Sequence, residues 1–423
     1  MVERPLSSSE SQPSSHNHLD AISTQVESLS DDLRRISLSI HDQPELQFKE
    51  FHAHRVLTEY LQKQHGWKVT PSAYDIATAF VAEFDSRRDG PVVSFNAEYD
   101  ALVGIGHACG HNLIAITSLG AALATAKLME EKKLGGKVML FGTPAEEGGG
   151  GKIKLLKAGA YKGVDVSIMA HPGIEPDGAL IRTAAYHGFN VEYFGKEAHA
   201  AARPWDGINA LDALITAYNA VSVLRQQTQP GDIIQGMITN GGARPNIIHA
   251  YAAGRFVVRA HSKARLEELK KRVVPCFEAG ATATGATLKL TWKMPYDDHV
   301  PNRALGRHYR AAFNSLGGSI PAPDIDIITS VTQASTDQGN VSYALPSLHT
   351  SIWIRSEDDD GKQLGGPHTP DFTKAVRTEE AHSLAKRAAK ALAATAVDVL
   401  TCDGLLDEIK REFEEMKKAE CLA

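Results

Sequence analysis

Short apolar runs alternate with helical patterns along the first part of the chain, and this alternation most constrains the fold. Four runs have the length of a strand, at residues 76–84, 91–102, 136–144 and 164–173. Residues 111–131 and 152–160, which lie between these runs, have the spacing of helices. Apolar strands separated by helices indicate an α/β sheet covered on both faces. Ligands of such sheets bind beyond the carboxyl ends of the strands.

The remaining pattern predicts the domain organisation. Apolar residues over 19–40 recur at steps of three and four, as on one face of a long amphipathic helix, and a second helix is expected over 50–64. The order strand, helix, strand, strand, helix, strand over 184–296 indicates an inserted α+β domain. We therefore expect a disordered tail over 1–18, a discontinuous outer domain over 19–183 and 297–423, and an inserted domain over 184–296.

Composition disfavours several classes of partner and location. The chain has 423 residues, a formal net charge of -6 and a pI of about 6.3, so charge gives no basis for nucleic-acid binding. Since it has no run of about eighteen apolar residues, we expect no membrane span. The four cysteines show no paired spacing, and the serine-rich N-terminal segment lacks the apolar core of a secretory signal. The resulting expectation is a cytoplasmic protein.

A glycine-rich stretch after the second apolar run carries the first candidate metal ligands. EYDALVGIGHACGHN, residues 98–112, places Cys109 and His111 where a strand ends and a helix begins. A thiolate and an imidazole together suit zinc or another borderline-soft divalent ion. Asp100, in the same stretch, is the kind of carboxylate that orients a ligand imidazole. The stretch predicts a metal site.

Two adjacent glutamates follow the third apolar run. In FGTPAEEGGGGK, residues 141–152, Glu146 and Glu147 precede four glycines. Adjacent carboxylates point in different directions, so one can bind a metal while the other deprotonates a water. A solvated turn is the simpler alternative. A phosphate loop is disfavoured, because Ile153 follows Lys152 where that motif requires serine or threonine.

Two histidines extend this set of candidate ligands. His171 lies in MAHPG at the end of the fourth apolar run, and His368 lies in GGPHTPDF near the C-terminus. Each histidine alone is more often structural than a ligand. Together, however, the clusters contain nearly enough ligands for two metal ions. The sequence has no Gly-x-Ser-x-Gly motif, so a serine hydrolase is not expected.

These motifs resemble those of the M20 family of metallopeptidases and amidohydrolases. HACGHN, TPAEE, the inserted domain and PHT occur in the family's order over about residues 20–400. The sequence is most similar to the branch of aminoacylases, auxin-conjugate hydrolases and aminobenzoyl-glutamate hydrolase, and within it to the peptidase M20 domain-containing protein 2 group. The resemblance implies a zinc-peptidase-like α/β catalytic domain with a covered mixed sheet. It also implies that the inserted α+β domain is a lid that forms a homodimer interface.

The resemblance also implies roles for individual residues. Two divalent metal ions, zinc first and manganese or cobalt as alternatives, would be bound by Cys109, His111, Glu147, His171 and His368, with Cys109 bridging. Glu146 would be the general base for the water between the ions, and Asp100 would orient a ligand. In the inserted domain, His199 of GKEAHAA would reach the partner's active site. Asn246 and Arg244 of GGARPNIIH would bind the substrate, the arginine through a carboxylate.

The expected function is hydrolysis of the amide bond of a small dipeptide or N-acyl amino acid. The most similar group implies a β-alanyl or γ-aminobutyryl part joined to a basic amino acid. Aminobenzoyl-glutamate, an amide of secondary metabolism and the synthetic direction stay open. An inactive metal-bound regulatory scaffold and a thiol enzyme with Cys109 as nucleophile are rivals from other classes. STDQGNVS, residues 335–342, which contains Asp337, has no assigned role.

Overall fold

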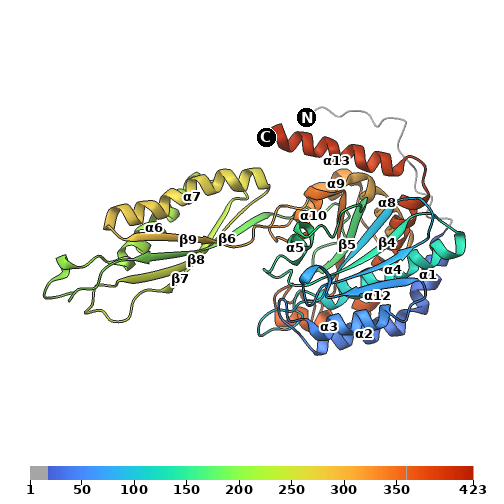
Figure 1. Ribbon diagram of the computed structural model, residues 1–423, viewed down its shortest axis with the longest axis horizontal. Coiled ribbons are helices and arrows are strands. Elements are labelled where there is room, and N and C mark those ends of the chain that lie inside the picture. Colours follow the sequence, from blue (N-terminus) through green and yellow to red (C-terminus); the bar gives the residue numbers. More distant parts are fainter. Residues whose placement is uncertain (1–17, 359, 423) are drawn as a thin grey trace. The chain divides into compact units, whose positions relative to one another are not determined.

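The structure is a computed structural model that describes residues 18–358 and 360–422 (Figure 1). The chain divides into two compact units. One contains the residues up to 182 together with 299–331 and 340–422, and the other contains 183–298 and 332–339. Residues 332–339 thus group with the inserted segment, whereas the sequence interpretation assigned them to the discontinuous outer domain. The tail expected over 1–18 lies outside the described residues, apart from His18.

The first unit is built on a mixed six-stranded sheet, as the fold expectation required. Its strands are β1 (Trp67–Pro71), β2 (Phe80–Asp85), β3 (Val92–Glu98), β4 (Lys137–Thr143), β5 (Val166–Gly173) and β10 (Ser347–Trp353). Their spatial order is β1-β2-β4-β3-β5-β10. β2 pairs antiparallel with both β1 and β4, and the other neighbours are parallel. β4, β3, β5 and β10 therefore end at the same edge of the sheet.

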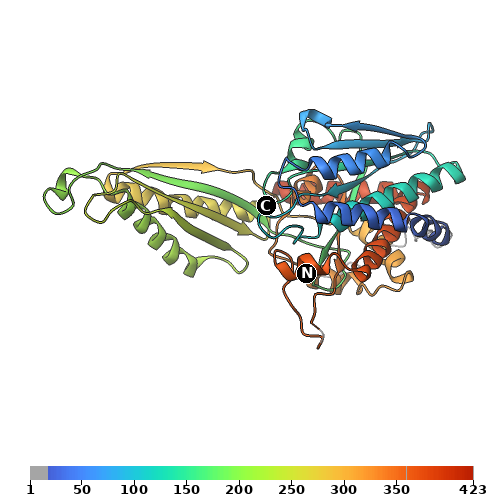
Figure 2. The ribbon, with the colours of Figure 1, turned by 90° about the horizontal axis from the view of Figure 1, so that it is seen from below.

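Helices cover both faces of this sheet (Figures 1 and 2). The described helices of the unit are α1 (Leu19–Ser28), α2 (Ser30–Asp42), α3 (Phe51–Leu61), α4 (His111–Lys132), α5 (Gly151–Lys157), α8 (Arg303–Ser315), α9 (Pro323–Thr329), α10 (Gln338–Ala344), α11 (Pro370–Ala375), α12 (Glu379–Thr401) and α13 (Leu405–Leu422), with the short turn η2 (Ala73–Asp75). Only α10 begins in the segment that groups with the other unit.

The main core lies between the sheet and the helices α4 and α12. Val93, Phe95 and Ala97 of β3 point into this core, so the alternate residues of the strand face the opposite side of the sheet. On that opposite side, Phe141 of β4 packs in a smaller core with residues of α5 and α10. α4 is long and apolar enough to cross a membrane, but 94% of its most apolar window is buried in the protein.

The long helix expected over 19–40 is broken, so that part of the prediction was wrong. α1 ends at Ser28 and α2 begins at Ser30. The Ser28 hydroxyl donates to the carbonyl of Gln25 at 2.7 Å, and such local side-chain bonds compete with the backbone bonds of a helix. Each of the two helices still buries one apolar face, which is why the periodicity continues across the break.

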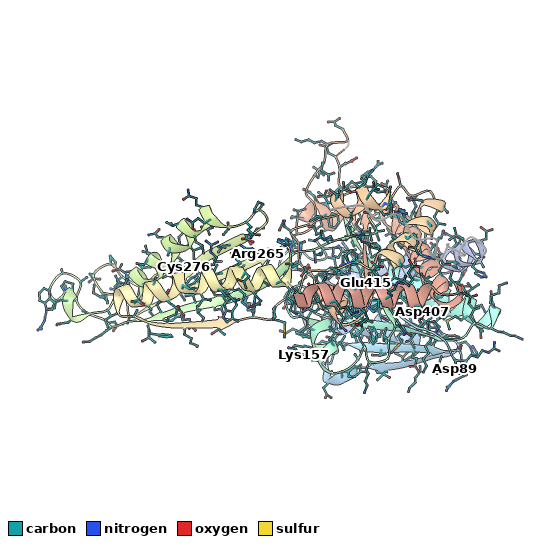
Figure 3. All side chains as sticks on the ribbon, turned by 90° about the horizontal axis from the view of Figure 1, so that it is seen from above. Asp89, Lys157, Arg265, Cys276, Asp407 and Glu415 are labelled. Atoms are coloured by element: carbon teal, nitrogen blue, oxygen red, sulfur yellow. The ribbon has the colours of Figure 1, made fainter. Side chains whose placement is uncertain are left out.

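The second unit is the predicted α+β insertion. It contains β6 (Ala185–Phe194), η3 (Pro204–Asp206), α6 (Ala210–Leu224), η4 (Arg225–Gln227), β7 (Ile233–Asn240), β8 (Tyr251–Ala260), α7 (Lys263–Thr284) and β9 (Thr287–Trp292). The strands form an antiparallel sheet in the order β7-β8-β6-β9. Phe189, Phe256 and Phe277 lie in the core of this unit. Arg265 on α7, labelled in Figure 3, pairs with Asp232 at 2.6 Å.

Candidate metal centre

The carboxyl ends of three neighbouring strands bring the candidate acidic groups together. β3 ends at Glu98 and is followed by Asp100, while β4 is followed by Glu146 and Glu147. His171 lies near the end of β5. Because β4, β3 and β5 are adjacent and parallel, these side chains share one edge of the sheet. The remaining candidates, Cys109, His111 and His368, lie at the start of α4 and just before α11.

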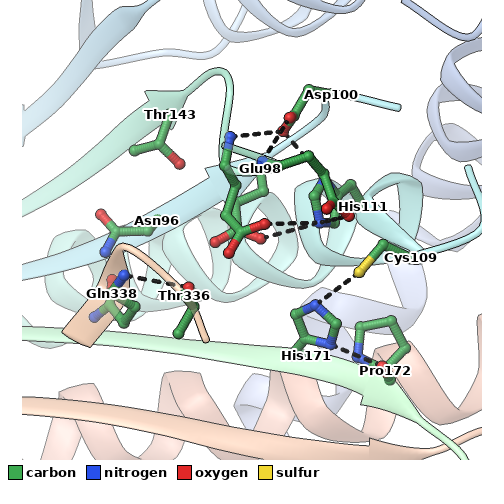
Figure 4. A network of polar contacts seen from close by, with 12 residues as sticks. Asn96, Glu98, Asp100, Cys109, His111, Thr143, His171, Pro172, Thr336 and Gln338 are labelled. Atoms are coloured by element: carbon green, nitrogen blue, oxygen red, sulfur yellow. Dashed lines mark hydrogen bonds and ion pairs between the residues drawn. The ribbon is translucent and has the colours of Figure 1, made fainter. Parts of the chain in front are cut away.

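Two groups of potential ligands share Cys109, and Figure 4 shows Cys109 with His111 and His171 of the first group. Ligand atoms of Cys109, His111 and His171 lie within 4.8 Å of one another, and so do those of Cys109, Glu147 and His368. Nε2 of His171 lies 3.4 Å from Sγ of Cys109. Nε2 of His368 lies 3.2 Å from Oε1 of Glu147. The structure thus brings the five predicted ligands together, with one sulfur common to both groups.

Buried polar atoms in this cluster fit a divalent cation. Among the described residues, Nε2 of His111 and Oε1 of Glu147 are buried without a hydrogen-bond partner. Nε2 of His111 faces Oε2 of Glu98 at 3.5 Å and Oε2 of Glu146 at 3.8 Å. Burial opposes a charge on this ring, but its interactions with Cys109 and Asp100 outweigh burial and raise the pKa of His111 well above its ordinary value. The cluster therefore attracts positive charge, and its thiolate, imidazole and carboxylate atoms are metal ligands.

Asp100 connects the two ligand-bearing loops. Its Oδ1 accepts from Nδ1 of His111 at 3.2 Å and from the backbone N–H of Glu146 at 3.1 Å. Its Oδ2 accepts from the backbone N–H of Glu147 at 3.0 Å. One buried carboxylate thus orients the His111 ring and holds the turn that carries both glutamates. Such a contact leaves Nε2 of the imidazole for a metal.

Steric constraints account for the four glycines after the glutamates. A Cβ at Gly151 would lie 1.7 Å from the carbonyl oxygen of Pro144, and a Cβ at Gly149 would lie 2.5 Å from the Cβ of Ala145. Gly148 and Gly150 have φ angles of 114° and 65°, which L side chains rarely adopt. The glycines therefore allow a tight turn that presents the glutamates and starts α5 directly afterwards.

Strained backbone and a buried carboxyl hold this turn in place. Ala145 has a φ of 59°, a left-handed conformation that costs about 1 kcal/mol or more for a residue with a Cβ. Its N–H donates to Oε1 of Glu50 at 2.9 Å, and Thr78 donates to the other oxygen of Glu50 at 2.7 Å. Burial raises the pKa of Glu50 to about 7. Glu50 therefore holds the backbone of the turn that carries Glu146 and Glu147.

Backbone contacts position the two remaining candidate histidines, His171 and His368. Nδ1 of His171 donates to the carbonyl of Pro172 at 2.8 Å, which leaves Nε2 for the Cys109 side. The backbone N–H of His368 donates to the carbonyl of Ala108 at 2.8 Å, and His368 has a φ of 69°. Its side chain is 55% exposed, whereas His111 is fully buried.

The predicted substrate-binding residues lie in the second unit, whereas all five predicted ligands lie in the first. His199 and Ile247 form a β-bridge, and the N–H of Ala200 donates to the carbonyl of Asn246 at 3.1 Å. Asn246 and Arg244 are exposed in the chain, and His199 is also exposed. Nδ1 of His199 accepts from the N–H of Ala202 at 3.1 Å, so the ring carries its hydrogen on Nε2.

Sequence reasoning missed three charged residues of this region, namely Glu50, Glu98 and Lys152. Glu98 and Lys152 lie inside the two quoted motifs, and all three side chains are fully buried. Strand alternation could have identified Glu98, because it shares a face of β3 with Ser94 and Asn96. Because a buried charge needs a partner, a glutamate at this buried position predicts that a positively charged group lies close to it.

The chain is similar to known proteins over most of its length. The sequence profile of peptidase family M20/M25/M40 matches residues 89–398. The human Xaa-Arg dipeptidase is 40% identical over 404 residues, which cover 92% of this chain and 90% of that protein. One subunit of the p-aminobenzoyl-glutamate hydrolase of Escherichia coli (strain K12) is 29% identical over 450 residues, covering 90% of this chain and 92% of that one.

Solved structures share the fold. A Bacillus subtilis protein described as a dinuclear metal binding peptidase from the M20 family superposes with a TM-score of 0.63. It is 21% identical, and the match covers 90% of this chain and 99% of that one. An aminobenzoyl-glutamate utilization protein from Klebsiella pneumoniae superposes with a TM-score of 0.64 at 18% identity, covering 88% and 97%.

Proposed function

Because the chain belongs to peptidase family M20/M25/M40, it is a hydrolase of amide or peptide bonds, and we propose that it cleaves small dipeptides at a two-metal centre. The observation that carries this proposal is the sulfur of Cys109, which is common to two groups of ligand atoms. Cys109 would therefore serve as a ligand common to both ions. Nε2 of His111, which is buried without a hydrogen-bond partner among the described residues, supports the same proposal.

Each ion has a proposed set of protein ligands. Cys109, His111 and His171 would hold one ion, and Cys109, Glu147 and His368 would hold the other. The mixture of thiolate, imidazole and carboxylate favours zinc, with manganese and cobalt as alternatives. When bound, divalent ions of this kind polarise a carbonyl group and lower the pKa of water.

Glu146 is the proposed general base. Its side chain is nearly buried, and its Oε2 lies 3.8 Å from Nε2 of His111, at the edge of the two ligand groups. The Asp100 contact to its backbone N–H fixes the start of the side chain. In this position Glu146 takes a proton from the attacking water and gives it to the leaving amine.

His199 is proposed to complete the site of the other protomer in a homodimer. The contact from Ala202 to Nδ1 leaves Nε2–H as the donor. That donor would stabilise the oxyanion that forms at the scissile carbonyl. The exposure of His199 in the single chain is consistent with a role at a surface that another molecule covers.

The protonation of the Cys109 thiol disfavours the alternative mechanism, in which this cysteine is the nucleophile. Burial, and then repulsion from Glu147, raise the pKa of the Cys109 thiol well above its usual range. A protonated thiol is a poor nucleophile, which disfavours the thiol-enzyme alternative, whereas metal binding removes the thiol proton.

Cys109, Cys276 and Cys402 are free thiols, and this supports the cytoplasm as the proposed location.

The proposed substrate is a dipeptide that ends in a basic amino acid, with a β-alanyl or γ-aminobutyryl residue first. The support is the 40% identity to the human Xaa-Arg dipeptidase, against 29% for the Escherichia coli p-aminobenzoyl-glutamate hydrolase. Arg244 would bind the terminal carboxylate, which both kinds of substrate possess, and Asn246 would bind the amide. The side chain next to that carboxylate, basic or acidic, therefore separates the two candidates.

A substrate panel with defined metals tests the proposal. The protein is depleted of metal with a chelator and reloaded with zinc, manganese or cobalt in turn. Amine release is then measured from β-alanyl and γ-aminobutyryl dipeptides of lysine, ornithine and arginine, from N-acyl amino acids, and from p-aminobenzoyl-glutamate. We expect basic dipeptides to be cleaved fastest and only after reloading. Equal rates before and after metal removal would refute the metal mechanism, and faster cleavage of p-aminobenzoyl-glutamate would refute the substrate assignment.

A further inference from the structure

A fully buried ion pair adjoins the candidate metal centre. Nζ of Lys152, the second residue of α5, lies 2.5 Å from Oε1 of Glu98, the last residue of β3. Both side chains have no exposed surface. Burial of two charges costs several kcal/mol per ion, and an apolar pair of similar volume is often as stable. Stability alone therefore does not explain why this ion pair is buried here.

The second carboxylate oxygen of Glu98 lies beside a proposed metal ligand. Among the described residues, Oε2 of Glu98 is buried without a hydrogen-bond partner. It lies 3.5 Å from Nε2 of His111, the atom left for a metal once Nδ1 contacts Asp100. Two ligand atoms at ~2.1 Å from one tetrahedral ion lie about 3.4 Å apart, so this separation suits two ligands of the same ion. Figure 4 shows the ion pairs that link His111 to the carboxylates around it.

Local structure keeps Glu98 in this orientation. Asn96, which lies two residues earlier on the same face of β3, has a side-chain partner of its own, since it accepts a hydrogen bond from Tyr161 at 2.9 Å. Lys152 approaches from α5, which starts immediately after the tight turn that Gly151 allows. Ligand atoms of Glu98, His111 and Glu146 lie within 4.8 Å of one another. Lys152 thus holds one carboxylate oxygen while the other faces the metal centre.

We propose that Glu98 is an additional metal ligand, bound to the same ion as His111, and that Lys152 is the positioning residue that orients its carboxylate. This inference rests on the proposed two-metal function and adds a residue to the five ligands expected from the sequence. A purely structural ion pair is the competing explanation. It predicts that changes to Glu98 or Lys152 alter the stability of the fold and leave metal affinity unchanged.

Metal binding by four variants separates the two explanations. Metal-free protein is titrated with zinc in competition with a chromogenic chelator, and bound zinc is counted by elemental analysis. Glu98→Gln should lower the affinity for one of the two ions by about 10–100-fold, and Lys152→Met should lower the affinity for the same ion. The double variant should bind no more weakly than Glu98→Gln alone, since Lys152 acts through Glu98. Tyr161→Phe, which removes a hydrogen bond in the same buried layer, is the matched control and should bind both ions normally.

Stability and a conservative variant complete the test. Glu98→Asp keeps the charge but shortens the side chain, so it should also lower affinity for one ion, and it serves if Glu98→Gln fails to fold. Wild-type affinity for both ions in folded Glu98→Gln and Glu98→Asp would overturn the proposal. Unchanged affinity in the double variant, together with altered thermal stability, would establish the structural explanation instead. These measurements use no substrate, so they can fail independently of the dipeptidase assay.

Discussion

Asp100 accepts a hydrogen bond from Nδ1 of His111 at 3.2 Å, and this contact turns the other ring nitrogen toward the carboxylates of the site. The same carboxylate accepts from the backbone N–H groups of Glu146 and Glu147. Asp100 therefore sets the position of a ligand ring and of the proposed base at once. A small change at Asp100 should disturb both.

Replacement of Asp100 by asparagine should lower metal affinity by about 10–100-fold. The amide nitrogen of the new side chain cannot accept a hydrogen bond, so one of the three donors around it would lose its acceptor. Zinc titration of the metal-free variant measures the effect. Asp42→Asn, at a half-exposed surface ion pair, is the control. An Asp100→Asn protein with wild-type affinity would show that the contact does not organise the site.

The two adjacent glutamates should respond differently to the same substitution. Glu146→Gln should lower turnover by about 10²–10⁴-fold or more and leave metal content intact, because it removes the proposed base. Glu147→Gln should reduce metal content, since its Oε1 lies with His368 and Cys109 in one ligand group. Turnover and elemental analysis on both variants make the comparison. The reverse pattern would exchange the two assignments.

Wild-type protein should contain close to two divalent ions per chain, and Cys109→Ala should lose at least one. The reason is that Cys109 belongs to both three-residue ligand groups. Elemental analysis of the purified proteins gives the count. Cys276→Ala, on α7 of the other unit, is the matched control and should keep both ions. Full activity of a metal-free wild-type preparation would rule out the two-metal centre.

Glu50 should make the fold less stable as pH rises from about 4.5 to about 7. Its pKa is raised by burial from 4.5 to about 7 in the folded protein, so in this range the folded state keeps a proton that the unfolded state has lost. The free energy of unfolding then falls with rising pH, by on the order of 3 kcal/mol in total. Glu50→Gln removes this contribution, so its stability relative to wild type should increase across the range.

Urea unfolding at several pH values between about 4.5 and about 7.5, with metal content held constant, measures this difference. Glu59→Gln, on the exposed side of α3, is the control and should show a constant offset from wild type. A constant offset for Glu50→Gln as well would mean that this carboxyl ionises normally in the folded protein.

Subunit exchange tests whether His199 acts across a dimer. His199→Ala and Glu146→Gln homodimers should each be inactive, the first because loss of one oxyanion donor costs about 10²–10³-fold in turnover. When the two are mixed and exchange, half of the dimers are mixed and each mixed dimer has one complete site. The sample should therefore recover about a quarter of the wild-type rate. Verified exchange without recovered activity would show that His199 does not complete the partner's site.

Sequence pattern alone predicted the elements that are apolar throughout and the ligands that follow them. β3, β4, β5 and α4 are buried on nearly every side, so their composition reveals them without knowledge of their neighbours. The motifs after these strands contain four of the five proposed ligands, and PHT near the C-terminus contains the fifth. β1 was missed, since WKVTP is half exposed along its length and carries no apolar signal.

Tertiary structure decided the features that depend on residues far apart in the chain. Glu98 and Lys152 are 54 residues apart, and Glu50 contacts Ala145 across 95 residues. The grouping of 332–339 with the inserted segment likewise follows from contacts rather than from composition. Apolar periodicity reflects burial, which each residue type favours by itself. The partner of a buried charge is set by the packing of strands and helices, so no local pattern specifies it.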